Sequence, residues 1–170
     1  MKLRISSDLY RKLARALQAS AENETGGVLM GEQLAPGDFR LVDLTVAMRT
    51  GGPGHFERSA AEHGNMLEGF FKETGSDFNR FNYLGEWHSH PRDLPLPSGK
   101  DIISMRELLE EDPHIPFAVL MICRVIEDRL ALSATLFQPG LPHEEVELID
   151  DTRGKRHFEG QNDGENDNPE

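Results

Sequence analysis

The sequence has little that would suit a secreted or membrane-spanning protein. It holds one cysteine in 170 residues, so neither an intrachain disulfide nor a cysteine-rich zinc site can form. No stretch approaches the roughly eighteen consecutive apolar residues of a spanning helix. The opening residues, MKLRIS, lack the apolar run of a signal peptide. We therefore expect a cytoplasmic protein with no membrane partner.

Positive charge is also scarce. Lysine and arginine number 18 against 30 acidic residues, a formal net charge of −12. Because nucleic-acid binding depends largely on contacts between cations and phosphates, this balance argues against a DNA or RNA partner. The acidic excess is greatest near the end, and residues 160–170 have no apolar side chain. We predict a disordered, solubilising acidic tail over residues 153–170.

The rest of the chain has the composition of one globular domain, which we assign to residues 1–152. At 37% hydrophobic and 28% charged residues, it can bury a real core. The lone cysteine, Cys123, lies in the apolar run 117–123 and is interpreted as a core residue.

Periodic patterns predict an α/β fold, a mixed curved sheet flanked by helices. Helices are predicted over residues 8–21, capped by Ser6 or Ser7, and near 59–74, where Leu67, Phe70 and Phe71 would cover the sheet. A loop is expected at residues 50–55. Strands are predicted near residues 25–31, 39–47, 81–88, 117–125 and 129–137.

The most informative segment reads HSHP at residues 88–91. It ends the predicted strand 81–88. Residues two apart on a strand face the same side, so the imidazoles of His88 and His90 converge and one metal ion can bind both. A buried, hydrogen-bonded pair of core histidines is the alternative interpretation.

A serine and an aspartate follow at a spacing that can complete a metal site. Ser98 is typical of an N-cap, and the apolar spacing after it predicts a helix. Asp101 would lie in the first turn, where the positive end of the helix favours a carboxylate that can reach back to the histidines. Two imidazoles and a carboxylate can form a catalytic zinc site with a position left for water, which predicts hydrolysis. A plain helix cap is the alternative.

These residues resemble the signature of the JAMM metalloproteases, the catalytic branch of the JAB/MPN domains. That signature has an upstream glutamate, H-[ST]-H-P, a gap of seven residues after the second histidine, a serine, two residues and an aspartate, and every element is present. Residues 23–31, NETGGVLMG, resemble the family's upstream opening. The resemblance covers residues 1–150 and implies an MPN-type, cytidine-deaminase-like fold.

By this resemblance, His88, His90 and Asp101 bind Zn²⁺, Glu24 is the general acid/base and Ser98 stabilises the oxyanion. Zinc suits this chemistry because it polarises a scissile carbonyl and lowers the pKa of water to about 7. A carboxylate within hydrogen-bond reach can then carry the proton to the leaving amine.

The choice of Glu24 rests on the resemblance, since spacing alone does not separate it from Glu22 or Glu32. The glycine pair at residues 26–27 favours Glu24, because glycines let another segment approach closely, as a site near bound substrate requires. Glu86 lies two residues before His88 and is interpreted as a supporting residue rather than the base.

The resemblance further implies a zinc-dependent isopeptidase or peptidase that cleaves after the C-terminus of a ubiquitin-like modifier or its conjugates. The chain is most similar to the prokaryotic JAB proteins, which occur beside activating-like and conjugating-like enzymes, including in antiphage operons. Those enzymes would be partners, and the modifier's tail would add a strand to an exposed sheet edge. Two alternatives stay open: a non-catalytic MPN scaffold, and a RadC-like zinc hydrolase with another substrate.

Overall fold

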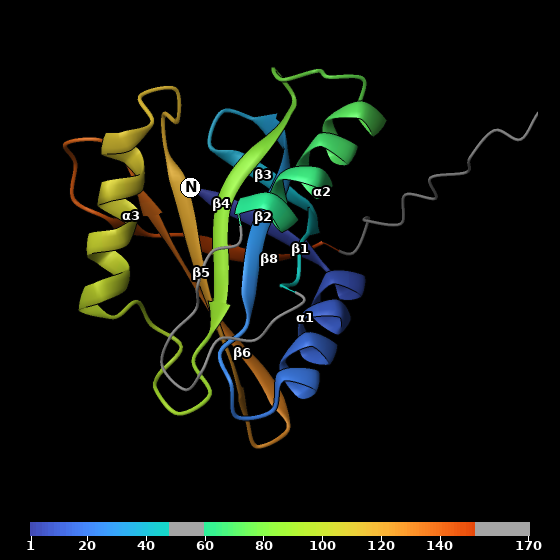
Figure 1. Cartoon of the computed structure of the whole chain (residues 1–170), viewed down its shortest axis with the longest axis vertical. Helices are drawn as coiled ribbons and strands as arrows, with labels where there is room; N and C mark the ends of the chain where they lie inside the picture. The colour runs from blue at the N-terminus through green and yellow to red at the C-terminus, as the bar shows by residue number, and fades with distance from the viewer. Residues whose placement is uncertain (48–59, 152–170) are drawn as a thin grey trace, which may run out of the picture.

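The computed structural model describes residues 1–47 and 60–151, and the predicted loop at 50–55 and tail at 153–170 lie outside them. A mixed eight-stranded sheet and three helices form the described part (Figure 1), which confirms the predicted α/β class. The elements are β1 (Lys2–Ser6), α1 (Ser7–Ser20), β2 (Gly26–Ala35), β3 (Asp38–Leu44), α2 (Ala60–Glu73), β4 (Phe81–Ser89), α3 (Gly99–Glu111), β5 (Ala118–Ile126), β6 (Arg129–Phe137), β7 (Glu144–Glu145) and β8 (Glu147–Asp151).

The sheet places the histidine-bearing strand in its interior. Strand order is β7-β6-β5-β4-β2-β3-β1-β8, with β4 antiparallel to β2 and parallel to β5. The predicted elements are all present, with boundaries within a few residues, but β1, β7 and β8 were not predicted. β1 pairs in parallel with β8, which lies far away in sequence. Because this pairing joins distant segments, no local sequence pattern predicts either strand.

Helices cover both faces of the sheet. α1 buries the predicted face Leu9, Leu13, Ala16 and Leu17 against a cluster that includes Met121 and Cys123 of β5. α3 buries Met105 and Leu109 against Leu120 and Ile122 of the same strand. Because alternate residues of β5 join opposite clusters, α1 and α3 lie on opposite faces. No helix in the described ranges is long and apolar enough to cross a membrane.

The register between β4 and β5 decides where each side chain near the histidines points. His88 lies beside Ile122 and Ser89 beside Cys123. Neighbouring residues at one level of a sheet point to the same face. His88 therefore lies on the α3 face, and Ser89 lies on the α1 face.

Two glycines allow close backbone approach near this strand. Gly85 has φ of 142°, and a Cβ there would lie 2.0 Å from the carbonyl oxygen of Val119. A Cβ on Gly27 would lie 2.1 Å from the carbonyl oxygen of Thr45. At Gly27 the segment that approaches closely is the protein's own backbone at Thr45. The nearness of the glycine pair to a bound substrate stays a prediction.

Candidate metal centre

Three predicted ligand side chains meet at the end of β4. The Nε2 atoms of His88 and His90 are 3.0 Å apart. Asp101, in the first turn of α3, places Oδ1 3.2 Å from Nε2 of His88 and Oδ2 3.5 Å from Nε2 of His90. Within residues 1–47 and 60–151, this is the group of histidine, cysteine or acidic residues that could hold a metal ion.

The donor set fits a zinc ion. At the usual zinc–ligand distances of about 2.0–2.2 Å, tetrahedral ligand atoms lie roughly 3.3 Å apart, close to the separations measured here. Nδ1 of His90 lies 3.1 Å from the carbonyl oxygen of Leu94. Since a carbonyl only accepts, Nδ1 carries a proton, so in the neutral ring Nε2 is the atom with the lone pair that a metal can bind.

Asp101 belongs both to the helix cap and to the histidine cluster. Ser98 is the N-cap of α3: its Oγ accepts from the N–H of Asp101 at 3.3 Å, and its own N–H donates to Oδ2 of Asp101 at 2.6 Å. Burial alone would raise the pKa of Asp101, but hydrogen bonds from His88, His90 and Ser98 outweigh it and hold the pKa well below its usual range. The cap and the cluster, posed as alternatives, coexist, and the carboxylate is ionised as a ligand must be.

The loop between the histidines and α3 is tied to the rest of the fold. Nη1 of Arg124, at the end of β5, donates to the carbonyl oxygen of Asp93 at 2.8 Å. Arg92 pairs with Glu22 across the surface, with Nη2 and Oε2 2.9 Å apart. The Arg124 contact holds the backbone next to Leu94, whose carbonyl oxygen accepts from the ring of His90, whereas the exposed pair of Arg92 and Glu22 contributes little.

Glu24 lies beside this cluster, just before β2. It is half-buried, and the next residue, Thr25, is bonded to Ser89, which lies between the two histidines in sequence. The pKa of His90 is raised, chiefly by its hydrogen bond to Asp101, and the negative charge of Glu24 contributes to the rise. The contacts of Thr25 therefore place the backbone of Glu24 next to the end of β4 that carries the predicted ligands, and the role of Glu24 stays a prediction.

The other two glutamates near it in sequence lie in unrelated surroundings. Glu22 is 77% exposed and pairs with Arg92. Glu32 is only 1% exposed and binds Arg40 and Arg80. It pairs with Phe81 at the start of β4, opposite the end that carries the histidines. Geometry therefore favours Glu24 over both alternatives.

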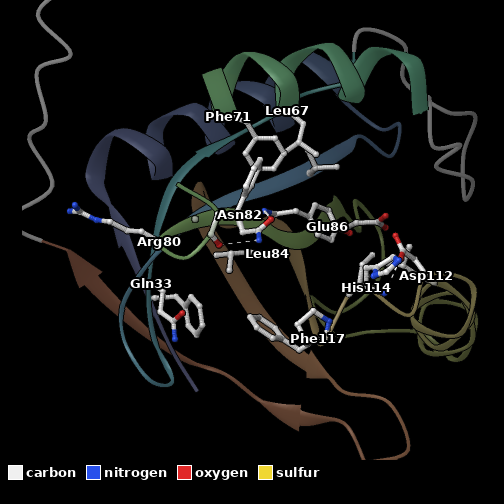
Figure 2. Close-up of a pocket in the computed structure, with 18 of the residues that line it drawn as sticks. Gln33, Leu67, Phe71, Arg80, Asn82, Leu84, Glu86, Asp112, His114 and Phe117 are labelled. Carbon is white, nitrogen blue, oxygen red and sulfur yellow. Dashed lines mark hydrogen bonds between the residues drawn. The ribbon is translucent and has the colours of Figure 1, made fainter. Parts of the chain in front are cut away.

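A cavity of about 860 Å³ is lined by residues of β4 that precede the histidines, and His88, His90 and Asp101 are not among its lining residues. Figure 2 shows Leu67 and Phe71 pointing into it from α2, with Phe117 on the opposite side. Glu86, two residues before His88, also lines it, so the cavity reaches toward the histidines. The sequence did not predict this cavity. The sequence feature that could have indicated it is the apolar side of α2. On that side Phe70 is buried, but Leu67 and Phe71 are only partly buried.

The strand that carries the histidines is paired on both sides over residues 85–89. The outer strands of the described sheet are β7 and β8. The addition of a strand by a modifier's tail at an exposed sheet edge stays a prediction.

Comparison with known proteins identifies relatives of this chain. The model of a family described as prokaryotic homologs of the JAB domain matches residues 6–134. Proteins named CD-NTase/cGAS isopeptidase are similar to it. The one from Enterobacter hormaechei is 33% identical over 106 residues, 61% of this chain and 55% of that protein. The one from Vibrio cholerae is 32% identical over 94 residues, 52% and 56% of the two chains. The chain thus spans about half the length of these curated relatives.

Solved structures show the same fold. A protein from Desulfitobacterium hafniense superposes with a TM-score of 0.66 at 19% identity, covering 91% of this chain and 98% of that one. A protein from Salinibacter ruber gives 0.52 at 21% identity, covering 91% and 94%. At these identities the likeness concerns the fold alone.

Proposed function

Because the chain belongs to the family of prokaryotic homologs of the JAB domain, we propose that it is a zinc-dependent isopeptidase acting on a ubiquitin-like modifier or its conjugates. The observation that carries the proposal is the meeting of His88, His90 and Asp101 at separations suited to tetrahedral zinc, with Glu24 beside them. The isopeptidase names of the relatives support cleavage of an amide bond.

The proposal gives each side chain a chemical role. Zinc bound here would supply a Lewis acid that polarises the scissile carbonyl and acidifies water. Glu24 takes a proton from the attacking water and returns it to the leaving amine. Ser98 already accepts a hydrogen bond from the N–H of Asp101, so its own hydroxyl hydrogen is left to donate to the developing oxyanion.

The cavity beside β4 is the proposed seat of the modifier's C-terminal tail. It is lined mainly by apolar side chains and by residues of β4 that precede the histidines, and Leu67 and Phe71 of α2 lie on one side of it. An extended tail lying there would point its carboxyl end along β4 toward His88. The relatives' names make conjugates of a CD-NTase or cGAS-like enzyme the first substrates to test.

The test presents fusions and conjugates of candidate ubiquitin-like proteins to the wild-type protein and to two variants. Glu24→Ala should keep stoichiometric zinc but lose cleavage by about 10²- to 10⁴-fold, as removal of a general base does. His88→Ala should lose both zinc and cleavage. Glu22→Ala is the matched control, because this exposed carboxylate lies only two residues from Glu24.

Each outcome separates the candidate functions. Wild-type protein that binds no zinc would support the non-catalytic scaffold instead. Full cleavage by the Glu24→Ala variant would assign the proton transfer to another group. Zinc binding without cleavage of any modifier fusion would favour a hydrolase with a different substrate.

A further inference from the structure

Ser89, between the two histidines, makes a hydrogen bond that an ordinary strand would not need. Its N–H donates to the carbonyl oxygen of Thr25 at 2.8 Å, as expected for antiparallel partners. The N–H of Thr25, however, donates to the Ser89 hydroxyl oxygen at 3.0 Å. In a regular ladder of this kind two opposed residues exchange both bonds through their backbones. One half of the last rung between β2 and β4 is therefore made by a side chain.

This rung lies where the chain leaves the sheet. The paired residues of β2 begin at Gly26, opposite His88, and Glu24 lies just outside the ladder. Ser89 is 2% exposed and Thr25 is 1% exposed, so water cannot replace the bond. Ser89 also points to the α1 face, away from the histidine rings, and so does not take part in the cluster itself.

We propose that Ser89 is a positioning residue that holds Glu24 at the metal centre. Its hydroxyl fixes the backbone of Thr25 opposite the end of β4, and Glu24 is the preceding residue of the chain. The segment 88–90 thus has two functions in this proposal: its histidines are two of the metal ligands, and its serine positions the general base. The inference rests on the proposed function, in which Glu24 transfers the proton.

The kinetic test uses zinc-loaded protein and a cleavable modifier fusion. Ser89→Ala should lower kcat by about 10- to 100-fold, the loss that accompanies misplacement of a catalytic group by around 1 Å. KM and zinc content should stay within about twofold. Ser89→Thr keeps the oxygen and should retain most of the activity. Equal losses in Ser89→Ala and Ser89→Thr would overturn the proposal.

A matched control separates positioning from the loss of any buried hydroxyl. Ser133, on β6 of the same sheet, has a buried Oγ with no hydrogen-bond partner among the described residues. Ser133→Ala should leave kcat unchanged. If Ser89→Ala does not fold, Ser89→Cys keeps the volume with a weaker acceptor and takes its place. A Ser133→Ala loss as large as that of Ser89→Ala would count against a specific role.

A double-mutant cycle tests whether Ser89 acts through Glu24. In a Glu24→Gln background, adding Ser89→Ala should cost less than about twofold in residual kcat, because the group being positioned is already inactive. A further loss as large as in the wild-type background would mean that Ser89 acts by another route.

A structural measurement keeps this inference distinct from the proposed function. In zinc-free protein, Ser89→Ala should accelerate hydrogen exchange of the Thr25 amide and shift the side-chain NMR resonances of Glu24, while Ser89→Thr should do neither. Unchanged Thr25 protection and Glu24 shifts in Ser89→Ala would refute the positioning role. If the wild-type protein cleaves no modifier, the proposed function fails, and the NMR result still decides what Ser89 does.

Discussion

Replacing Glu32 by glutamine separates a structural glutamate from a catalytic one. The Glu32 carboxylate is almost completely buried, with Oε1 accepting from Arg80 at 2.8 and 2.5 Å and Oε2 accepting from Nη1 of Arg40 at 3.1 Å. Glutamine keeps the shape, but it loses the charge and turns an amide N–H toward one of the arginines. The substitution therefore removes the buried negative charge that pairs with both arginines.

The expected cost is about 3 kcal/mol of unfolding free energy. Removing one partner of a buried ion pair costs about 3–5 kcal/mol. We expect the lower end, because the Arg80 side chain is 50% exposed and can be rehydrated, and Arg40 keeps Asp151 at 2.6 Å. For a domain of this size the loss corresponds to a fall in Tm of roughly 6–12 °C.

Urea denaturation and calorimetry of the zinc-loaded protein measure this loss, with Glu22→Gln as the exposed control at no more than about 1 kcal/mol. The kcat of the folded Glu32→Gln protein should be unchanged, because Glu32 lies opposite Phe81, which is about 23 Å along β4 from His88 at about 3.3 Å per residue. A stable Glu32→Gln protein with lost cleavage would refute the structural assignment. A loss of less than about 1 kcal/mol would refute the energetic reasoning.

Three further predictions concern the metal centre and its support. Asp101→Asn should weaken zinc binding, as measured by chelator competition. The expected loss of affinity is larger than the about 10- to 100-fold that accompanies loss of a hydrogen bond to a metal ligand. Arg124→Ala should weaken it by about tenfold, because the carbonyl of Asp93 loses its donor and the loop is no longer held; an unchanged zinc affinity would contradict this. Gly27→Ala should cost about 1–3 kcal/mol in urea denaturation, since its Cβ would meet the carbonyl of Thr45, and a neutral effect would show that the strands can separate there.

Local patterns predicted most of the fold because they depend on contacts close in sequence. The buried face of α1 and the helix begun by Ser98 both follow from helical spacing and cap chemistry. β1 and β8 could not be predicted in this way: each is five residues long, and they pair with each other across almost the whole chain. Their partners come from the tertiary arrangement.

The glutamates show the same limit at the site. Glu22, Glu24 and Glu32 have the same side chain and lie near one another in sequence. Only the folded structure makes the first an exposed surface pair, brings the second beside His90, and buries the third between two arginines. The environment of a carboxylate depends on segments that lie far away in sequence, so spacing alone cannot assign its role.

The sequence by itself determined that two histidines would face one side of a strand and that an aspartate would lie in the first turn of the next helix. Strand alternation and helix capping are local rules, and they hold here for His88, His90 and Asp101. Only the tertiary structure decided which glutamate joins them, that β4 is interior and offers no free edge, and that a cavity lies beside it. These features arise from the packing of β2, β5 and α2 around β4. That packing joins segments far apart in sequence, so local sequence patterns do not determine it.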